Sequence, residues 1–165
     1  MLQWAVDVHN GPVAIRYGRG GNRSYHDSAF ADGSVCCHRT GADVTLVTYG
    51  TLVDNAMDAA RILEEKGIQA TVLRLLMVAP LPVEDVCRLA APGKPVVVME
   101  ESQANAGIGE ALAYEIRQRM DVPVSTRNLG DQYVTHGNIN QLYAHYGLDG
   151  QSVADHVQEV LSDEN

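Results

Sequence analysis

The stretch Asp43-Val-Thr-Leu-Val-Thr-Tyr49, together with the Gly50-Thr51 that follows it, decides the fold. It is rich in β-branched residues, which favour strands. The residues after it carry apolar side chains at helical spacing, and Gly67 ends that pattern. Thr51 with Asp54 three residues later resembles a capping box. The sequence therefore predicts a strand over residues 43–49 and a helix from Thr51 to about Gly67. The apolar stripe of this helix consists of Leu52, Ala56, Ala59, Ala60 and Leu63.

The same alternation of strand and helix continues as far as residue 129. Further strands are predicted over residues 69–75, 95–99 and 122–129, and further helices over about 82–90 and 107–119. The run Pro95-Val-Val-Val-Met99 has the continuous apolar character of a strand buried on both faces. This order predicts an α/β fold with a mostly parallel sheet and helices on both faces. Two last helices are expected near residues 137–146 and 150–162.

The residues before this unit have a different character. A short helix is expected over residues 3–9, an alternating strand over residues 13–17, and a short strand over residues 35–38. Between them, residues 22–34 are polar and contain glycines, which predicts a surface linker. We therefore expect one compact domain from Val35 onward and a separate arm before it.

The composition excludes several classes of protein. With 45% hydrophobic and 20% charged residues the chain is expected to be globular, and it has neither an 18-residue apolar run nor a recognisable signal peptide. Residues 1–40 sum to a charge of +1 and residues 41–165 to −10, so binding to nucleic acid or to an anionic membrane is not expected. Three cysteines without a C-x-x-C motif are typical of a reducing compartment, which favours the cytoplasm.

Chemistry is expected beyond the carboxyl ends of the strands, where open α/β sheets bind ligands. The helix start at Thr51 could hold an anion or be a plain cap. Glu100 and Glu101 could do acid–base work, but neighbours on an extended strand point apart, so capping or interface roles are favoured. His136 could be a base or a surface residue. No P-loop and no G-x-G-x-x-G is present, and no histidines have metal-ligand spacing.

The segment Arg16-Tyr-Gly-Arg-Gly-Gly21 is the most suggestive one. Arg19 lies between glycines, which let an anion approach the backbone, and its guanidinium suits a phosphate. The residues themselves leave open whether this is a phosphate site or a solvated turn. An RGG-type RNA contact is disfavoured because the motif occurs once, on an acidic chain with one Phe.

An ordered set of motifs resembles the 1-deoxy-D-xylulose-5-phosphate synthase family. The segment Gly11-Pro-Val-Ala-Ile-Arg-Tyr-Gly-Arg-Gly20 is similar to its G-P-x-A-x-R-Y-P-R-G sequence. Further similar segments are Thr48-Tyr-Gly-Thr51, Leu75-Leu-Met-Val-Ala-Pro-Leu81, Met99-Glu-Glu-Ser with Ala106-Gly-Ile-Gly109, Asp131-Gln-Tyr-Val-Thr-His-Gly137 and Tyr146-Gly-Leu-Asp149. Gly18 and Gly130 stand where the family usually has proline, and Asn105-Ala106 replaces the first glycine of its Gly-rich stretch.

This resemblance implies a function that the composition alone does not. The family enzymes use thiamine diphosphate and magnesium to join pyruvate to glyceraldehyde 3-phosphate with release of CO2, a step of isoprenoid precursor synthesis. By resemblance, residues 1–21 are the end of the pyrimidine-binding domain, residues 22–34 a linker, and residues 35–165 a transketolase C-terminal-like domain. The resemblance assigns the substrate phosphate to Arg19 and carries over no catalytic, cofactor-binding or metal-binding residue.

The partners implied are the remainder of the enzyme and a second copy in a homodimer, in the cytoplasm. We expect the isolated chain to bind no thiamine diphosphate and to be inactive. Two alternatives stay open: a stand-alone assembly module that pairs with a separate thiamine-dependent catalytic chain, and an anion-sensing domain that uses the helix start at Thr51.

Overall fold

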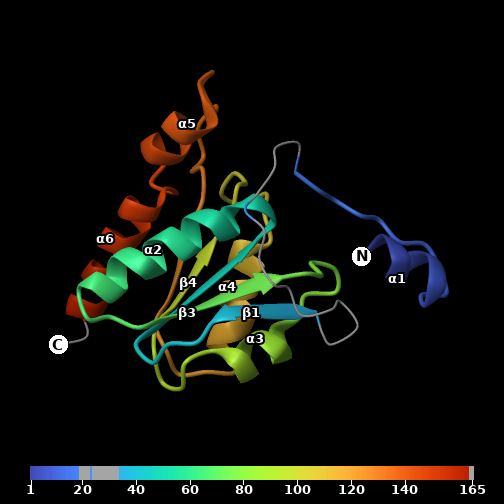
Figure 1. Ribbon diagram of the computed structural model, residues 1–165, viewed down its shortest axis with the longest axis horizontal. Helices are drawn as coiled ribbons and strands as arrows, with labels where there is room; N and C mark the ends of the chain where they lie inside the picture. The colour runs from blue at the N-terminus through green and yellow to red at the C-terminus, as the bar shows by residue number, and fades with distance from the viewer. Residues whose placement is uncertain (19–22, 24–33, 164–165) are drawn as a thin grey trace.

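A five-stranded sheet with the strand order β1-β3-β2-β4-β5 forms the centre of the molecule (Figure 1). The computed structural model describes residues 1–18, 23 and 34–163. β1 runs antiparallel to β3, and the other neighbours are parallel. The predicted α/β fold with a mostly parallel sheet is therefore confirmed. The strands are β1 (Val35–Arg39), β2 (Val44–Tyr49), β3 (Ala70–Leu75), β4 (Val96–Met99) and β5 (Val124–Arg127).

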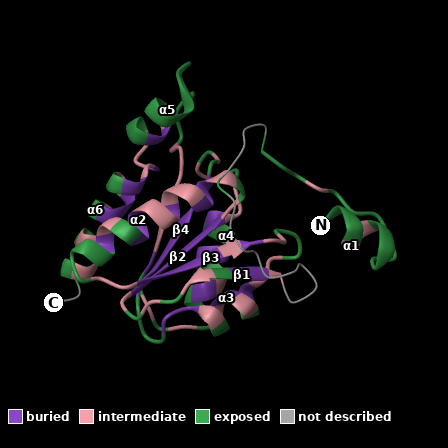
Figure 2. Cartoon of the chain, viewed as in Figure 1, coloured by how far each residue is buried: buried purple, intermediate pink, exposed green. Residues whose placement is uncertain are grey.

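Helices cover both faces of this sheet, as the sequence predicts (Figure 1). On one face lie α2 (Val53–Glu65) and α6 (Gly150–Ser162), and on the other lie α3 (Val83–Leu89) and α4 (Gly109–Arg117). Figure 2 shows the buried residues concentrated on the strands between these helices. The short helix α5 (Ile139–His145) carries Tyr143, which packs against Leu52 of the turn before α2 and against Leu148.

The central strand β2 is buried along most of its length, although it contains two threonines. Thr45 and Thr48 are both fully buried. The Thr45 hydroxyl accepts the N–H of Ala91 at 2.9 Å, and Thr48 donates to the Met99 carbonyl at 3.0 Å. A buried hydroxyl is costly without a partner, so these two bonds make the threonines compatible with the core.

The contact between α2 and α6 depends on a glycine. A Cβ on Gly150 would lie 2.7 Å from the Cβ of Asp58 and 3.1 Å from the N of Ala59. The missing side chain thus lets the start of α6 approach α2 closely. Next to it, Asn55 donates from its side chain to the carbonyl of Leu148 at 2.8 Å, which ties the segment before α6 to α2.

The beginning of the chain does not join this core. The predicted first helix is present as α1 (Leu2–Asp7), but none of its residues is buried. The predicted strand over residues 13–17 is wrong, because residues 12–18 form neither helix nor strand. A strand needs a neighbour to pair with, and the five-stranded sheet is complete without this segment.

The start of α2 also differs from the prediction. Gly50–Leu52 form a 3-10 turn, in which Gly50 has a φ of +64°, and α2 begins only at Val53 without a side-chain cap. The expected capping box of Thr51 and Asp54 is therefore wrong. The carboxylate of Asp54 instead accepts the backbone N–H of Arg23 at 3.1 Å.

The predicted linker lies almost entirely outside the described residues. Of the predicted linker, residues 22–34, the structure describes only Arg23 and Ser34. In the part of the chain that the structure describes, no helix has the length and apolar character needed to span a bilayer.

Candidate functional site

The carboxyl ends of the parallel strands meet at one edge of the sheet, and polar side chains gather there. β2 ends at Tyr49, β4 ends at Met99, and Glu100 and Glu101 follow β4 directly. The hydroxyl of Tyr49 donates to Oε2 of Glu100 at 3.2 Å. This is the edge at which open α/β sheets bind ligands. We call Tyr49, Glu100, Glu101 and Tyr143 the carboxyl-edge cluster.

Glu100 is the most deeply buried member of the cluster, with 1% of its surface exposed. Besides the Tyr49 hydroxyl, its Oε2 accepts the backbone N–H of Ile108 at 2.9 Å. Ile108 precedes the first turn of α4, so Glu100 satisfies one of the N–H groups that a helix start leaves without a partner.

Two glycines make room for the Glu100 carboxyl group. A Cβ on Gly107 would overlap it, and a Cβ on Gly109 would lie 2.6 Å from its Oε1. The Gly-x-Gly spacing before α4 thus serves close packing against a side chain of the same domain. The groups that these two glycines approach in the structure belong to Glu100.

Burial and the neighbouring carboxylate together raise the pKa of Tyr49 to about 12. Burial makes the larger contribution, and the negative charge of Glu100 adds to it. Tyr49 therefore stays protonated at neutral pH and acts here as a hydrogen-bond donor. A phenol held in this way is a poor general base.

Glu101 turns to a different partner. Its side chain accepts the hydroxyl of Tyr143 at 2.9 Å, which ties the end of β4 to α5. Burial is also the main reason why the pKa of Tyr143 is raised. Glu100 and Glu101 thus bind separate groups, in agreement with the expectation that adjacent carboxylates do not converge. Both of them fasten loops at this edge.

The remaining sequence candidates lie around the same edge or outside the described residues. His136 is exposed, in a segment from Asp131 to Asn140 whose residues are all exposed. Arg19 lies outside the described residues. Arg16 is exposed, and its positive charge partly offsets the rise of the Tyr49 pKa.

A cavity of about 300 Å³ adjoins the end of β5. Its lining combines amide, imidazole and phenol groups with backbone. The lining residues are Asn128, Leu129, Gly130, Gln132, His145 and Tyr146. Among the residues described, no group of three or more His, Cys, Asp or Glu could hold a metal ion. In the carboxyl-edge cluster Glu100 is engaged by Tyr49 and Ile108, and Glu101 by Tyr143, so we derive no chemical step through a magnesium–diphosphate group.

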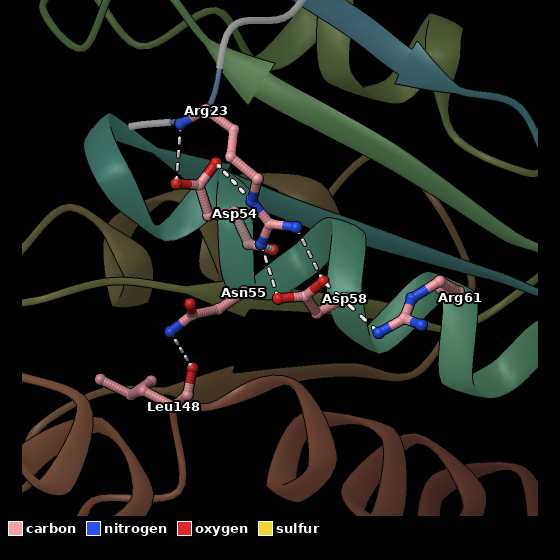
Figure 3. Close-up of polar contacts among 6 residues, drawn as sticks. All are labelled: Arg23, Asp54, Asn55, Asp58, Arg61 and Leu148. Carbon is pink, nitrogen blue, oxygen red and sulfur yellow. Dashed lines mark hydrogen bonds and ion pairs between the residues drawn. The ribbon is translucent and has the colours of Figure 1, made fainter. Parts of the chain in front are cut away.

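The sequence prediction missed a dense set of polar contacts, which lies at the first turns of α2 (Figure 3). The Arg23 guanidinium donates to both carboxylate oxygens of Asp58, at 2.9 and 2.6 Å. The same side chain also contacts Asp54. Asp54 and Asp58 are four residues apart on one helix face. This spacing of two aspartates indicates a binding site for a cation, but the sequence does not identify the residue that binds there.

Comparison with known protein families agrees with this fold. Residues 33–153 match the family "Transketolase, C-terminal domain". The chain is 32% identical over 164 residues to a 1-deoxy-D-xylulose-5-phosphate synthase of Chlorobium luteolum, covering 96% of this chain and 26% of that protein. It is 33% identical to the enzyme of the same name from Gloeothece citriformis, with 95% and 26% coverage. The chain thus spans about a quarter of the length of these relatives.

This chain is also similar to relatives of which it covers nearly half. One subunit of an apulose-4-phosphate transketolase from Phocaeicola vulgatus is 33% identical over 145 residues, covering 86% of this chain and 46% of that protein. A solved split-gene transketolase, described as an inactive β4 tetramer, has a TM-score of 0.72 at 28% identity and covers 88% of this chain and 48% of its own.

A transketolase from Pichia stipitis shares the fold, with a TM-score of 0.66 at 17% identity. The family match, the order of the strands and the helices on both faces all agree. The chain belongs to the transketolase C-terminal domain family.

Proposed function

We propose that this chain is the C-terminal part of a thiamine diphosphate-dependent 1-deoxy-D-xylulose-5-phosphate synthase. Such an enzyme converts pyruvate and glyceraldehyde 3-phosphate to 1-deoxy-D-xylulose 5-phosphate and CO2, for isoprenoid precursors. The observation that carries the proposal is the extent of the similarity. The alignment to the Chlorobium luteolum synthase takes in 96% of this chain, and so leaves few residues outside it at either end.

The proposed division of the chain follows from the same similarity. Residues 1–21 would be the end of the preceding pyrimidine-binding domain, residues 22–34 a linker, and residues 35–165 the C-terminal domain. The exposure of α1 supports this division, because Leu2 and Val6 are 73% and 80% exposed. Apolar side chains on an element without buried residues suit a segment that packs against another domain.

In this proposal the chain contributes support and one substrate contact. Arg19 would bind the phosphate of glyceraldehyde 3-phosphate, as the segment Arg16-Tyr-Gly-Arg19 resembles the family sequence. Thiamine diphosphate and magnesium would be held by segments outside this chain. The carboxyl-edge cluster would keep α4 and α5 in place beside the reaction centre, without touching the reacting atoms, and the whole enzyme would be a homodimer.

The first experiment is an assay of the purified 165-residue chain. Pyruvate, glyceraldehyde 3-phosphate, thiamine diphosphate and magnesium are supplied, and product is measured by mass spectrometry. We expect no product and no heat of thiamine diphosphate binding, while the Chlorobium luteolum synthase turns over under the same conditions. Turnover by the isolated chain would overturn this part of the proposal.

The second candidate is an assembly module that pairs with a separate thiamine-dependent catalytic chain. The match to one subunit of an apulose-4-phosphate transketolase and the likeness to a split-gene transketolase favour it specifically. Co-purification of the untagged chain with a larger thiamine-dependent chain from the native organism would support this candidate. An upstream reading frame that continues into the start of this chain would support the synthase instead.

A further inference from the structure

Of the described residues before Val35, Ser34 is bonded to Asp85 and Leu76 directly ahead of β1, and Arg23, farther back along the chain, makes a dense set of polar contacts with α2. We propose that Arg23, Asp54 and Asp58 form a latch that fastens the N-terminal segment to helix α2 at the carboxyl edge of the sheet. The cation that binds Asp54 and Asp58 is thus Arg23 of the same chain, which lies 31 and 35 positions from them in the sequence. The latch stands on the described contacts and does not depend on the proposed function.

The geometry of the latch is that of a specific guanidinium site (Figure 3). Nη1 and Nη2 of Arg23 donate to the two oxygens of Asp58, at 2.9 and 2.6 Å. Nη2 also donates to the backbone carbonyl of Asp54 at 2.9 Å, and Nε lies 3.6 Å from its Oδ1. A two-pronged contact of this kind combines charge with a fixed orientation, which a lysine could not reproduce.

Backbone contact adds a constraint that a side-chain ion pair lacks. The N–H of Arg23 donates to Oδ2 of Asp54 at 3.1 Å, so the main chain itself is held against α2. The side chains of Asp54 and Asp58 are 20% and 34% exposed and that of Arg23 is 53% exposed, so water screens the charges and the pattern of hydrogen bonds gives the contact its specificity. The latch therefore holds both the guanidinium and the backbone N–H of Arg23 against α2.

The latch lies at the same edge of the sheet as the carboxyl-edge cluster. α2 follows β2 after the Gly50–Leu52 turn, so its first turns belong to the same edge as Tyr49. Seven residues before Arg23, the charge of Arg16 acts on Tyr49. Arg23 thus meets the domain at this edge. In the proposed enzyme, the latch would attach the N-terminal segment, which carries the proposed phosphate contact, to this domain.

Trypsin tests the latch in the 165-residue chain. Trypsin must take the Arg23 side chain into its own acidic pocket, so a latched Arg23 is protected. Fragments are identified by mass spectrometry, and cleavage before Ser24 is compared with cleavage before Tyr17, after the exposed Arg16. We expect Asp58→Asn to raise cleavage after Arg23 about fivefold. Asp155→Asn, which removes a carboxylate from an exposed pair with Lys66, is the matched control and should change nothing.

The result that would overturn the latch is equally rapid cleavage after Arg23 in the wild type, in Asp58→Asn and in the control. A second readout does not depend on protease access. The Arg23 hydrogen bond is the main cause that lowers the pKa of Asp58 below its ordinary value of 3.8. A carbon-13 NMR titration should show this pKa rising toward the ordinary value in Arg23→Gln. An unchanged titration of Asp58 would also overturn the latch.

Discussion

At the scale of single residues, Glu100 shows how a structural carboxyl group can look like a catalytic one in the sequence. It stands at a strand end, beside a second glutamate and before a Gly-x-Gly motif. In the structure it is 1% exposed and is engaged by the Tyr49 hydroxyl and by the N–H of Ile108. The sequence alone shows the position of Glu100 and favours capping. It cannot show the Tyr49 bond, which spans 51 positions.

A conservative change at Glu100 should therefore cost stability. In Glu100→Gln the carbonyl oxygen can keep the two bonds of Oε2, and the NH2 group then puts a new donor in the place of the buried Oε1. Leaving a buried donor unsatisfied costs about 1–3 kcal/mol. We expect the free energy of unfolding, measured with urea, to fall by this amount. Glu101→Gln, at an exposed side chain bonded to Tyr143, should lose less than about 1 kcal/mol. Equal stability of the wild type and Glu100→Gln would contradict the role given to the carboxyl group.

Arg19 belongs to the proposed function, and its test needs an enzyme that contains this chain as its C-terminal part. Arg19→Ala should raise the KM for glyceraldehyde 3-phosphate and leave the KM for pyruvate unchanged, because only the first substrate carries a phosphate. Steady-state kinetics with each substrate varied in turn gives the answer. Asp7→Ala, in α1, is a control that should alter neither KM. An unchanged KM for the phosphorylated substrate in Arg19→Ala would remove the phosphate role.

His156 predicts a specific dependence of stability on pH. Its Nε2 lies 3.0 Å from the hydroxyl of Ser125, and burial, followed by the charge of Arg127, lowers its pKa below 6.5. The folded state thus holds this proton more weakly than the unfolded chain does. The contribution of His156 is present above about pH 6.5 and is lost as the pH falls toward the lowered pKa.

The corresponding measurement compares melting temperatures at about pH 7.5 and about pH 5.5, on either side of the ordinary histidine pKa. We expect His156→Gln to lose less of its melting temperature on acidification than the wild type loses. His136→Gln, at an exposed histidine, should behave like the wild type. An equal loss in wild type and His156→Gln would show that the buried imidazole does not carry this pH dependence.

At the scale of elements, the strands and helices between residues 43 and 129 follow from the sequence, because strands buried on both faces must be continuously apolar. Their ends follow less well. The prediction for β5 takes in residues 122–129, but the strand covers only Val124–Arg127. The segment over residues 13–17 has the alternation of a strand but no neighbour to pair with in the described chain. Local pattern therefore predicts what an element could be, and partners decide whether it forms.

The packing of α6 on α2 supplies a test at this scale. Gly150→Ala introduces a Cβ that would lie 2.7 Å from the Cβ of Asp58, so the two helices must move apart. Overpacking of this kind costs about 1–3 kcal/mol. We expect the free energy of unfolding in urea to fall by this amount. Gln151→Ala, at the next residue of α6, which is exposed, should change the free energy of unfolding little. Unchanged unfolding of Gly150→Ala would contradict the close helix contact.

At the scale of the whole molecule, the chain consists of a packed α/β domain and an N-terminal segment with an exposed helix. The uneven charge follows the same division, since the first 40 residues are slightly basic and the remainder is acidic. The composition of the sequence predicts this division. It cannot predict the latch, because an exposed arginine has many possible carboxylate partners and the two that it finds are 31 and 35 positions away.

The central claim is that this chain does the work of the C-terminal part of a 1-deoxy-D-xylulose-5-phosphate synthase. The most direct measurement replaces the matching C-terminal quarter of the Chlorobium luteolum synthase with this chain and follows formation of 1-deoxy-D-xylulose 5-phosphate. We expect the hybrid to fold and to make this product from pyruvate and glyceraldehyde 3-phosphate. A hybrid that folds and binds thiamine diphosphate but forms no product would contradict it.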